Sequence, residues 1–217
     1  MKCRSVAYVL TALVCGTGLV ACGGDDEGGK DDKTVAGAER TTSPKPSPSS
    51  PSSKPPAGKP EIRLPGDISM TFESVRTGDV AKDAALADSA QRMRALNADI
   101  AGTDPGGKAL AAYTTGQATE ASASWINQFT DAGLTITGAF RYYDRKVTLN
   151  DDGTASVVFC ADESKAFAKE KKTGKVRRTT PSDEDFIIYN TRLAKNADGI
   201  WQTTQVFSKA GVKQCVR

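Results

Sequence analysis

The sequence predicts an α+β domain, in which helices come first along the chain and an antiparallel β-meander follows. Two observations lead to this fold class. Apolar residues recur at helical spacing between residues 79 and 132. From Leu134 onward, the pattern changes to apolar runs separated by turn signals, as expected for strands. Helices followed by a run of strands are typical of α+β domains, and no internal repeat is evident.

Two helical regions are predicted. In the first, residues 79–101, Asp79 is a suitable N-cap and Gly102 ends the helix. Its inward face is formed by Leu86, Ala90, Met93, Asn97 and Ile100. The second region runs from about residue 108 to residue 132, with a weak point at 114–116 and Gly133 as its C-terminal stop.

The strands are predicted from apolar runs and the turn signals between them. A β-rich run covers residues 134–149, the turn signal 150–153 follows, and a second run covers residues 155–160. A third run begins at residue 186 and reaches Leu193. The turn signal 196–199 then precedes a last run over residues 201–207. This arrangement is that of an antiparallel meander.

The N-terminus has the features of an export signal that ends in a lipid attachment site. Lys2 and Arg4 precede an apolar run that is too short for a membrane-spanning helix of ~20 residues. The run ends in Leu19-Val20-Ala21-Cys22, which has the form of a lipobox. We therefore expect a signal peptide over residues 1–21 and a diacylglyceryl group on Cys22. Two acyl chains anchor a protein stably, which predicts a lipid-anchored protein on the extracellular face of the cell membrane.

An uncleaved transmembrane anchor is the alternative interpretation of this segment. It is less favoured because Gly16 and Gly18 interrupt the apolar run and an acidic, Gly-rich stretch follows it. Residues 22–60 are of low complexity, first rich in Gly and Asp and then in Pro, Ser and Lys, which predicts a disordered tether. Residues 61–217 are then expected to form the folded domain.

Charge and cysteine content limit the classes of function. The whole chain carries a net charge of +3, and Lys2 and Arg4 supply two of these charges, so the mature protein carries +1 and nucleic acid is not an expected partner. Cys160 and Cys215 are the two cysteines left after export and lipidation. Outside the cell such a pair predicts a disulfide. A metal or redox pair is the weaker alternative because no other cysteine or histidine completes a site.

The chain contains no histidine. This absence excludes Ser-His-Asp and Cys-His nucleophile systems, His-ligated zinc and the usual proton shuttle near neutral pH. An enzyme of this sequence would have to work with Asp, Glu, Lys, Tyr or Arg. We expect no cofactor and no metal site.

Seven short segments are spread over the domain: 64–67, 82–88, Trp125-Ile126, 133–138, Arg141-Tyr142-Tyr143, 159–164 and 189–193. Together they resemble a family of secreted actinobacterial lipoproteins of unknown function. The resemblance carries no known activity, so it implies no catalytic residues. The order of elements also resembles the nuclear-transport-factor-2-like cone of ketosteroid isomerase relatives, in which helices pack on a curved meander. This fold hosts many functions.

Three groups of residues are candidates for function, and each has a structural alternative. The aromatic residues Tyr113, Trp125, Phe129, Tyr142 and Tyr143 can line a cone-type cavity, although core packing is the favoured interpretation. Tyr142 and Tyr143 are adjacent on a predicted strand, so at most one points into a pocket. Asp144, with Arg141 and Arg145, is the nearest approach to an acid/base set, although surface salt bridges are favoured.

The third candidate is the basic run at residues 165–178, whose net charge of +6 suits an anionic wall polymer or lipid phosphate. A solvated hairpin tip or long loop is the favoured alternative. The leading hypothesis for the whole chain is a non-catalytic surface lipoprotein whose domain binds a small ligand, a wall component or a protein partner. The alternatives are a histidine-free enzyme of the ketosteroid-isomerase-like superfamily and a wall-contact protein that uses residues 165–178.

Overall fold

The computed structural model describes residues 58–104 and 106–217. The predicted signal peptide, the lipidation site Cys22 and nearly all of the predicted tether therefore lie outside the described residues. Among the described residues, no helix is both long enough and apolar enough to cross a bilayer. The elements are β1 (Ile68–Phe72), α1 (Val80–Ala101), α2 (Lys108–Tyr113), α3 (Gln117–Asp131), β2 (Leu134–Leu149), β3 (Ala155–Glu170), β4 (Val176–Arg177), β5 (Phe186–Lys195) and β6 (Trp201–Ala210), with short 3₁₀ turns at Asp183–Asp185 and Lys213–Cys215.

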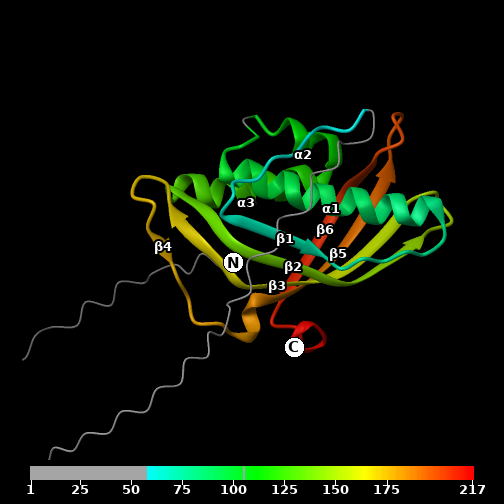
Figure 1. Cartoon of the computed structure of the whole chain (residues 1–217). Coiled ribbons are helices and arrows are strands. Elements are labelled where there is room, and N and C mark those ends of the chain that lie inside the picture. Colours follow the sequence, from blue (N-terminus) through cyan, green and yellow to red (C-terminus); the bar gives the residue numbers. More distant parts are fainter. Residues whose placement is uncertain (1–57, 105) are drawn as a thin grey trace, which may run out of the picture. The chain divides into compact units, whose positions relative to one another are not determined.

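The strands form one six-stranded sheet in the order β1-β2-β3-β5-β6, with β4 paired to β3. The pairs β2–β3, β3–β5 and β5–β6 are antiparallel, so the predicted meander is confirmed. The sequence pattern did not indicate β1, which lies before the helices and pairs in parallel with β2. The α+β fold class is confirmed, with the three helices lying over one face of the sheet (Figure 1).

The helices begin and end where the local signals predict. The Asp79 side chain accepts hydrogen bonds from the backbone N–H groups of Ala81 and Lys82, and thus caps α1. The long second helical region is divided at the predicted weak point, where Thr114 has extended backbone and α3 starts after Gly116. Gly133 follows α3 with a φ of +66°, a left-handed conformation that glycine adopts without strain.

The sheet is curved, and β2 carries two register irregularities against β3, between Ala139 and Arg141 and between Tyr143 and Lys146. Such bulges bend a strand and increase its twist. Gly138 lies beside the first irregularity with a φ of +101°, and a Cβ atom at this position would collide with the backbone carbonyl of Lys165. Glycine is therefore required where β2 bends around the helices.

The sheet has a main core on its concave face and a small second core on its convex face. The main core joins α1 and α3 to the sheet through residues such as Leu86, Leu96 and Phe140. On the other face, Tyr143 packs with Cys160 and Cys215. These cysteines are joined as predicted, with Cα atoms 5.5 Å apart, and so tie the C-terminal segment to β3.

The fold also uses residues at the end of the predicted tether. The Lys59 ammonium forms an ion pair with the carboxylate of Asp88, whose side chain is fully buried on α1. The other carboxylate oxygen of Asp88 accepts a 3.0 Å hydrogen bond from the backbone N–H of Trp201 at the start of β6. Lys59 is thus fastened to the helix layer, at a carboxylate that also holds the start of β6.

Candidate functional site

A cavity lies between the helix layer and the concave face of the sheet. Its outer part has a volume of about 330 Å³, and its inner end has a volume of about 20 Å³. Leu96, Trp125 and Tyr189 line both parts, so the two are adjacent. The inner volume accommodates about one water molecule, whereas the outer one lies in the range of small-molecule sites.

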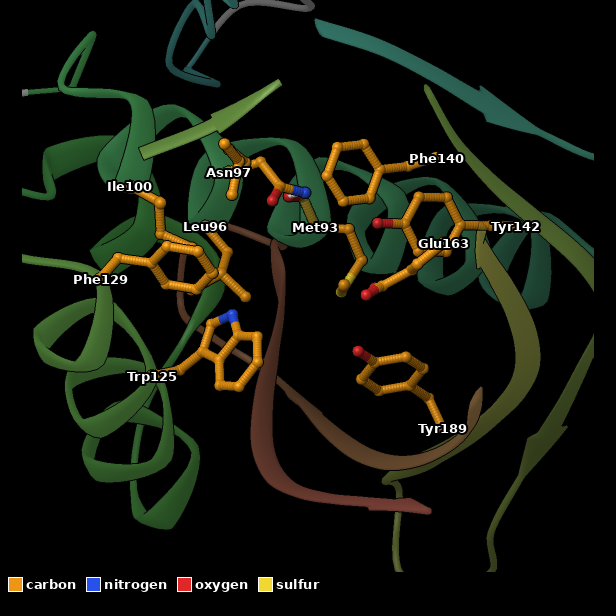
Figure 2. Close-up of a pocket in the computed structure, with 11 residues that line it drawn as sticks. Met93, Leu96, Asn97, Ile100, Trp125, Phe129, Phe140, Tyr142, Glu163 and Tyr189 are labelled. Atoms are coloured by element: carbon orange, nitrogen blue, oxygen red, sulfur yellow. Dashed lines mark hydrogen bonds between the residues drawn. The ribbon is translucent and has the colours of Figure 1, made fainter. Parts of the chain in front are cut away.

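The inner end of the cavity carries a carboxylate and two phenols. Glu163 on β3 is only 7% exposed, and it lines the inner end together with Tyr142 and Tyr189. Figure 2 shows the Glu163 carboxylate and the two phenol hydroxyls directed into the same space. The Tyr142 hydroxyl is buried and has no partner in hydrogen-bond geometry among the described residues.

A row of aromatic rings across four strands positions both phenols. The rings of Phe72 and Tyr142 are stacked with centroids 4.6 Å apart, and those of Phe159 and Tyr189 are stacked at 5.0 Å. Tyr142 and Phe159 meet edge to face at 5.9 Å and so join the two stacks. Such contacts fix the ring planes and leave little freedom for either hydroxyl.

The environment disfavours ionisation of these phenols. Burial raises the pKa of Tyr142 well above its usual value of 10, and the negative charge of Glu163 raises it further. The pKa of Tyr189 is raised by the same two causes in the same order. Both tyrosines therefore remain neutral hydrogen-bond donors at physiological pH.

The outer part of the cavity contains a buried cation. Arg92 on α1 is 4% exposed and lines the outer cavity. Its Nη2 donates a 2.9 Å hydrogen bond to Ser122 Oγ on α3, and Nη1 lies 3.6 Å from Met93 Sδ. Its Nε has no hydrogen-bond partner among the described residues. Burial lowers the pKa of Arg92 to about 10, so the guanidinium is still charged at neutral pH.

The five aromatic candidates are divided between three places. Trp125, Phe129 and Tyr142 line the inner cavity. Tyr113 is buried at the end of α2 and does not line it, and Tyr143 belongs to the small core on the opposite face. The prediction that at most one of Tyr142 and Tyr143 faces a pocket is therefore confirmed.

The predicted acid/base set around Asp144 does not form in the cavity. Asp144 is exposed and accepts a 2.9 Å ion-pair contact from Arg217. The Arg141 guanidinium lies over the Tyr143 ring at 4.7 Å, and Arg145 donates to the backbone carbonyl of Leu86. The favoured interpretation of Asp144 as a surface salt-bridge residue is confirmed.

The basic run is only partly a loop. Residues 165–170 belong to β3, Thr173-Gly174 lies in the turn to β4, and residues 176–177 form β4. Part of its charge is compensated locally, because Lys169 pairs with Asp67 and Arg177 pairs with Glu170. Arg178 stacks on Phe167. This surface is less strongly cationic than the sequence count indicates.

Sequence reasoning missed the two buried charged residues of the cavity, Glu163 and Arg92. Glu163 lies beyond residue 160, where the predicted strand ended, although it occupies the same face as the buried residues Val157, Phe159 and Ala161. Arg92 follows Asp88 by four residues, a spacing typical of exposed helix pairs, yet both are buried. For both residues, the useful signal was an inward position in an apolar periodicity.

The described residues contain no group of three or more Cys, Asp or Glu side chains arranged to hold a metal ion. The cavity offers two carboxylates (Glu163 at the inner end and Glu184 in the outer lining), two neutral phenols, the Asn97 amide and one guanidinium inside an otherwise largely apolar wall. Such a set can bind and orient a polar group, or exchange a proton with it.

The structural class of this domain is an α+β fold in which helices cover a curved sheet and a cavity lies between the two layers. The domain is similar to a ketosteroid isomerase-like protein from Erwinia carotovora atroseptica SCRI1043, with 21% identity over 61% of this chain and 97% of that chain and a TM-score of 0.42. It is also similar to ActVI-ORFA from Streptomyces coelicolor, at 12% identity over 58% of this chain and 92% of that chain, with a TM-score of 0.39.

A further similar structure is the intermembrane space region of the chloroplast protein ARC6, at 12% identity over 58% of this chain and 92% of that chain, with a TM-score of 0.35. No family model and no curated protein matches the chain. The proteins with similar structures thus include ketosteroid isomerase-like proteins, as the element order suggested. At these identities and TM-scores, none of their activities is carried over to this chain.

Proposed function

We propose that this protein is a lipid-anchored module on the extracellular face of the cell membrane and that its domain binds a small ligand without catalysing a reaction. The observation that carries the binding role is the cavity of about 330 Å³ with its polar inner end. Largely apolar cavities of this size, with a few convergent polar groups, are typical of small-molecule sites.

The location is proposed from the lipobox and from the resemblance to secreted actinobacterial lipoproteins. We expect a mature N-terminus at Cys22 that carries a diacylglyceryl group, which mass spectrometry of the N-terminal peptide measures directly. In the Cys22→Ser chain the protein should move from the membrane fraction to the soluble exported fraction. A Cys22→Ser protein that stayed on the membrane after export would contradict the anchor.

Ligand binding can be tested with the full chain carrying Cys22→Ser, so that neither acyl chains nor detergent interfere. Native and denaturing masses of the protein purified from its own host should differ by the mass of a bound molecule. Ala121 is exposed on α3 and lines the outer cavity, so Ala121→Trp should remove this extra mass. The control is Ala123→Trp on the same helix, at an exposed position that does not line the cavity. Equal masses in the unsubstituted protein would contradict a resident ligand.

A proton-transfer enzyme is the second candidate function, and the position of Glu163 between two neutral phenols favours it. Isomerase-type sites combine a carboxylate base with a phenol that donates to the developing oxyanion. If Glu163 acts as such a base, a ligand recovered from the protein should exchange a carbon-bound hydrogen in D₂O. The exchange should be lost in Glu163→Gln. A ligand that binds without exchange would support the non-catalytic function.

A further inference from the structure

The most unusual group in the cavity is the guanidinium of Arg92. Arginine is seldom buried unless it is paired with an anion. No ion pair joins Arg92 to a carboxylate within the part of the chain that the structure describes. Its hydrogen-bond partner is the neutral hydroxyl of Ser122, which in turn donates to the backbone carbonyl of Ala118 at 2.7 Å. Within the described part of the chain, this positive charge is thus buried without an ion-pair partner, and the other charged residue of the outer lining is the exposed Glu184.

Leaving a buried charge without a counter-charge is costly, and an apolar residue of similar volume would avoid this cost. The cavity therefore carries a cation whose presence the folded state alone does not explain. Because no described residue accepts a hydrogen bond from the Nε–H, the guanidinium keeps at least one donor for an incoming group. The planar fork of arginine matches the two oxygens of a carboxylate.

The walls around this cation are mostly apolar. Leu96 and Trp125 contribute from the helices, and Ile187 and Val206 contribute from β5 and β6. At the inner end, the negative charge of Glu163 opposes a second anionic group on the ligand, whereas the neutral phenols of Tyr142 and Tyr189 accept an apolar or weakly polar end. With Glu163 at the inner end and Glu184 in the outer lining, the charges favour a single acidic group, located at Arg92.

Building on the proposed ligand-binding function, we infer that the ligand is a small amphipathic monocarboxylic acid. Its carboxylate pairs with Arg92 beside Ser122, and its apolar body packs against Trp125, Leu96 and Ile187 with its far end toward Glu163. The source of such an acid, a free fatty acid or an aromatic acid, does not alter this recognition.

The test compares two probes of equal carbon chain, octanoate and 1-octanol, by isothermal titration calorimetry on the full chain carrying Cys22→Ser. The variants are Arg92→Met, which removes the charge, and Arg92→Lys, which keeps it. The matched control is Arg76→Met, at an exposed position outside the cavity. We expect octanoate to bind at least about tenfold more tightly than octanol, as a charge-assisted hydrogen bond provides. This preference should vanish in Arg92→Met, shrink in Arg92→Lys and persist in Arg76→Met.

The outcomes separate the two proposals. Equal binding of both probes, with no effect of Arg92→Met, would overturn the acid-binding inference but leave ligand binding intact. Binding of neither probe, together with the absence of any co-purified molecule, would contradict the ligand-binding function itself. Should Arg92→Met fail to fold, the octanoate-to-octanol ratio in the unsubstituted chain and its reduction in Arg92→Lys decide the question.

Discussion

The two faces of the sheet give neighbouring tyrosine hydroxyls different hydrogen-bonding environments. Tyr142 and Tyr143 follow one another on β2, and each is only 1% exposed. On the concave face, the Tyr142 hydroxyl has no hydrogen-bond partner among the described residues. On the convex face, the Tyr143 hydroxyl donates to the backbone carbonyl of Cys215, and the Arg141 and Arg217 guanidiniums lie over its ring at 4.7 and 4.1 Å.

The two faces also differ in whether their buried polar groups have partners. The convex core closes the C-terminal segment with a disulfide and a satisfied hydrogen bond, which are contributions to stability. On the concave face, the Tyr142 hydroxyl and the Arg92 Nε–H lie beside a cavity and have no hydrogen-bond partners in the part of the chain that the structure describes. Buried polar groups without partners lower stability, so their position at the cavity supports a role in binding.

The largest expected effect is on the convex face. The disulfide closes a loop with a sequence separation of 55 residues, for which loop-closure entropy predicts a stabilisation of about 4 kcal/mol. The double variant Cys160→Ala, Cys215→Ala should lose about this free energy of unfolding in urea titrations followed by tryptophan fluorescence. Reducing agent should destabilise the unsubstituted protein and leave the variant unchanged. A loss well below 1 kcal/mol would show that the convex core does not depend on the bond.

Removing each tyrosine hydroxyl should change stability in opposite directions. Tyr143→Phe loses the hydrogen bond to Cys215 and should lower the free energy of unfolding by about 1 kcal/mol. Tyr142→Phe removes a buried hydroxyl that has no partner in hydrogen-bond geometry among the described residues, although the Asn97 amide lies close enough to lower its pKa, and should raise this free energy by up to about 1 kcal/mol. Urea unfolding of the two variants measures both values. Equal losses in the two variants would end the contrast between the faces.

Alkaline titration should separate the same residues by pH. The folded-state pKa values of Tyr142 and Tyr189 lie above the unfolded value near 10, because of burial first and the Glu163 charge second. The stability that these phenols contribute is therefore fully present below pH 10 and is lost as the pH rises through their folded-state values. Phenolate absorbance near 295 nm should appear earlier in Glu163→Gln than in the unsubstituted protein. An unchanged titration curve would show that the Glu163 charge does not raise the pKa of either phenol.

The smallest effect is expected at Asp144. Its exposed ion pair with Arg217 should contribute no more than about 0.5 kcal/mol, because such pairs are screened by solvent. Asp144→Asn should thus change neither the free energy of unfolding beyond this amount nor the binding of octanoate. A marked loss of binding in Asp144→Asn would return Asp144 to the list of site residues.

Local signals were sufficient for much of the fold. The cap at Asp79, the division at residues 114–116 and the turns at residues 150–153 and 196–199 depend on a few adjacent residues, and all are found in the structure. The strand β1 was missed because five residues before the first helix gain their structure only by pairing with β2, 70 positions away at Ile68↔Gly138. The full length of β3 likewise depends on its partner, since residues 161–170 carry many charges.

The site was less predictable than the fold, for a related reason. Trp125 and Tyr142 were candidates because aromatic residues at inward positions are visible in the sequence. Glu163 and Arg92 escaped notice because charged residues usually face solvent, and their burial follows only from how the sheet curves beneath the helices.

The ion pair between Lys59 and Asp88 has a practical consequence for where this domain begins. Composition places its start at residue 61, yet the cation that accompanies the fully buried Asp88 carboxylate is supplied by residue 59. A shortened protein that started at residue 61 would contain the residues of every helix and strand but would lack this cation. A proteolytic cut between residues 59 and 61 would have the same effect. The folded part of the chain therefore includes Lys59.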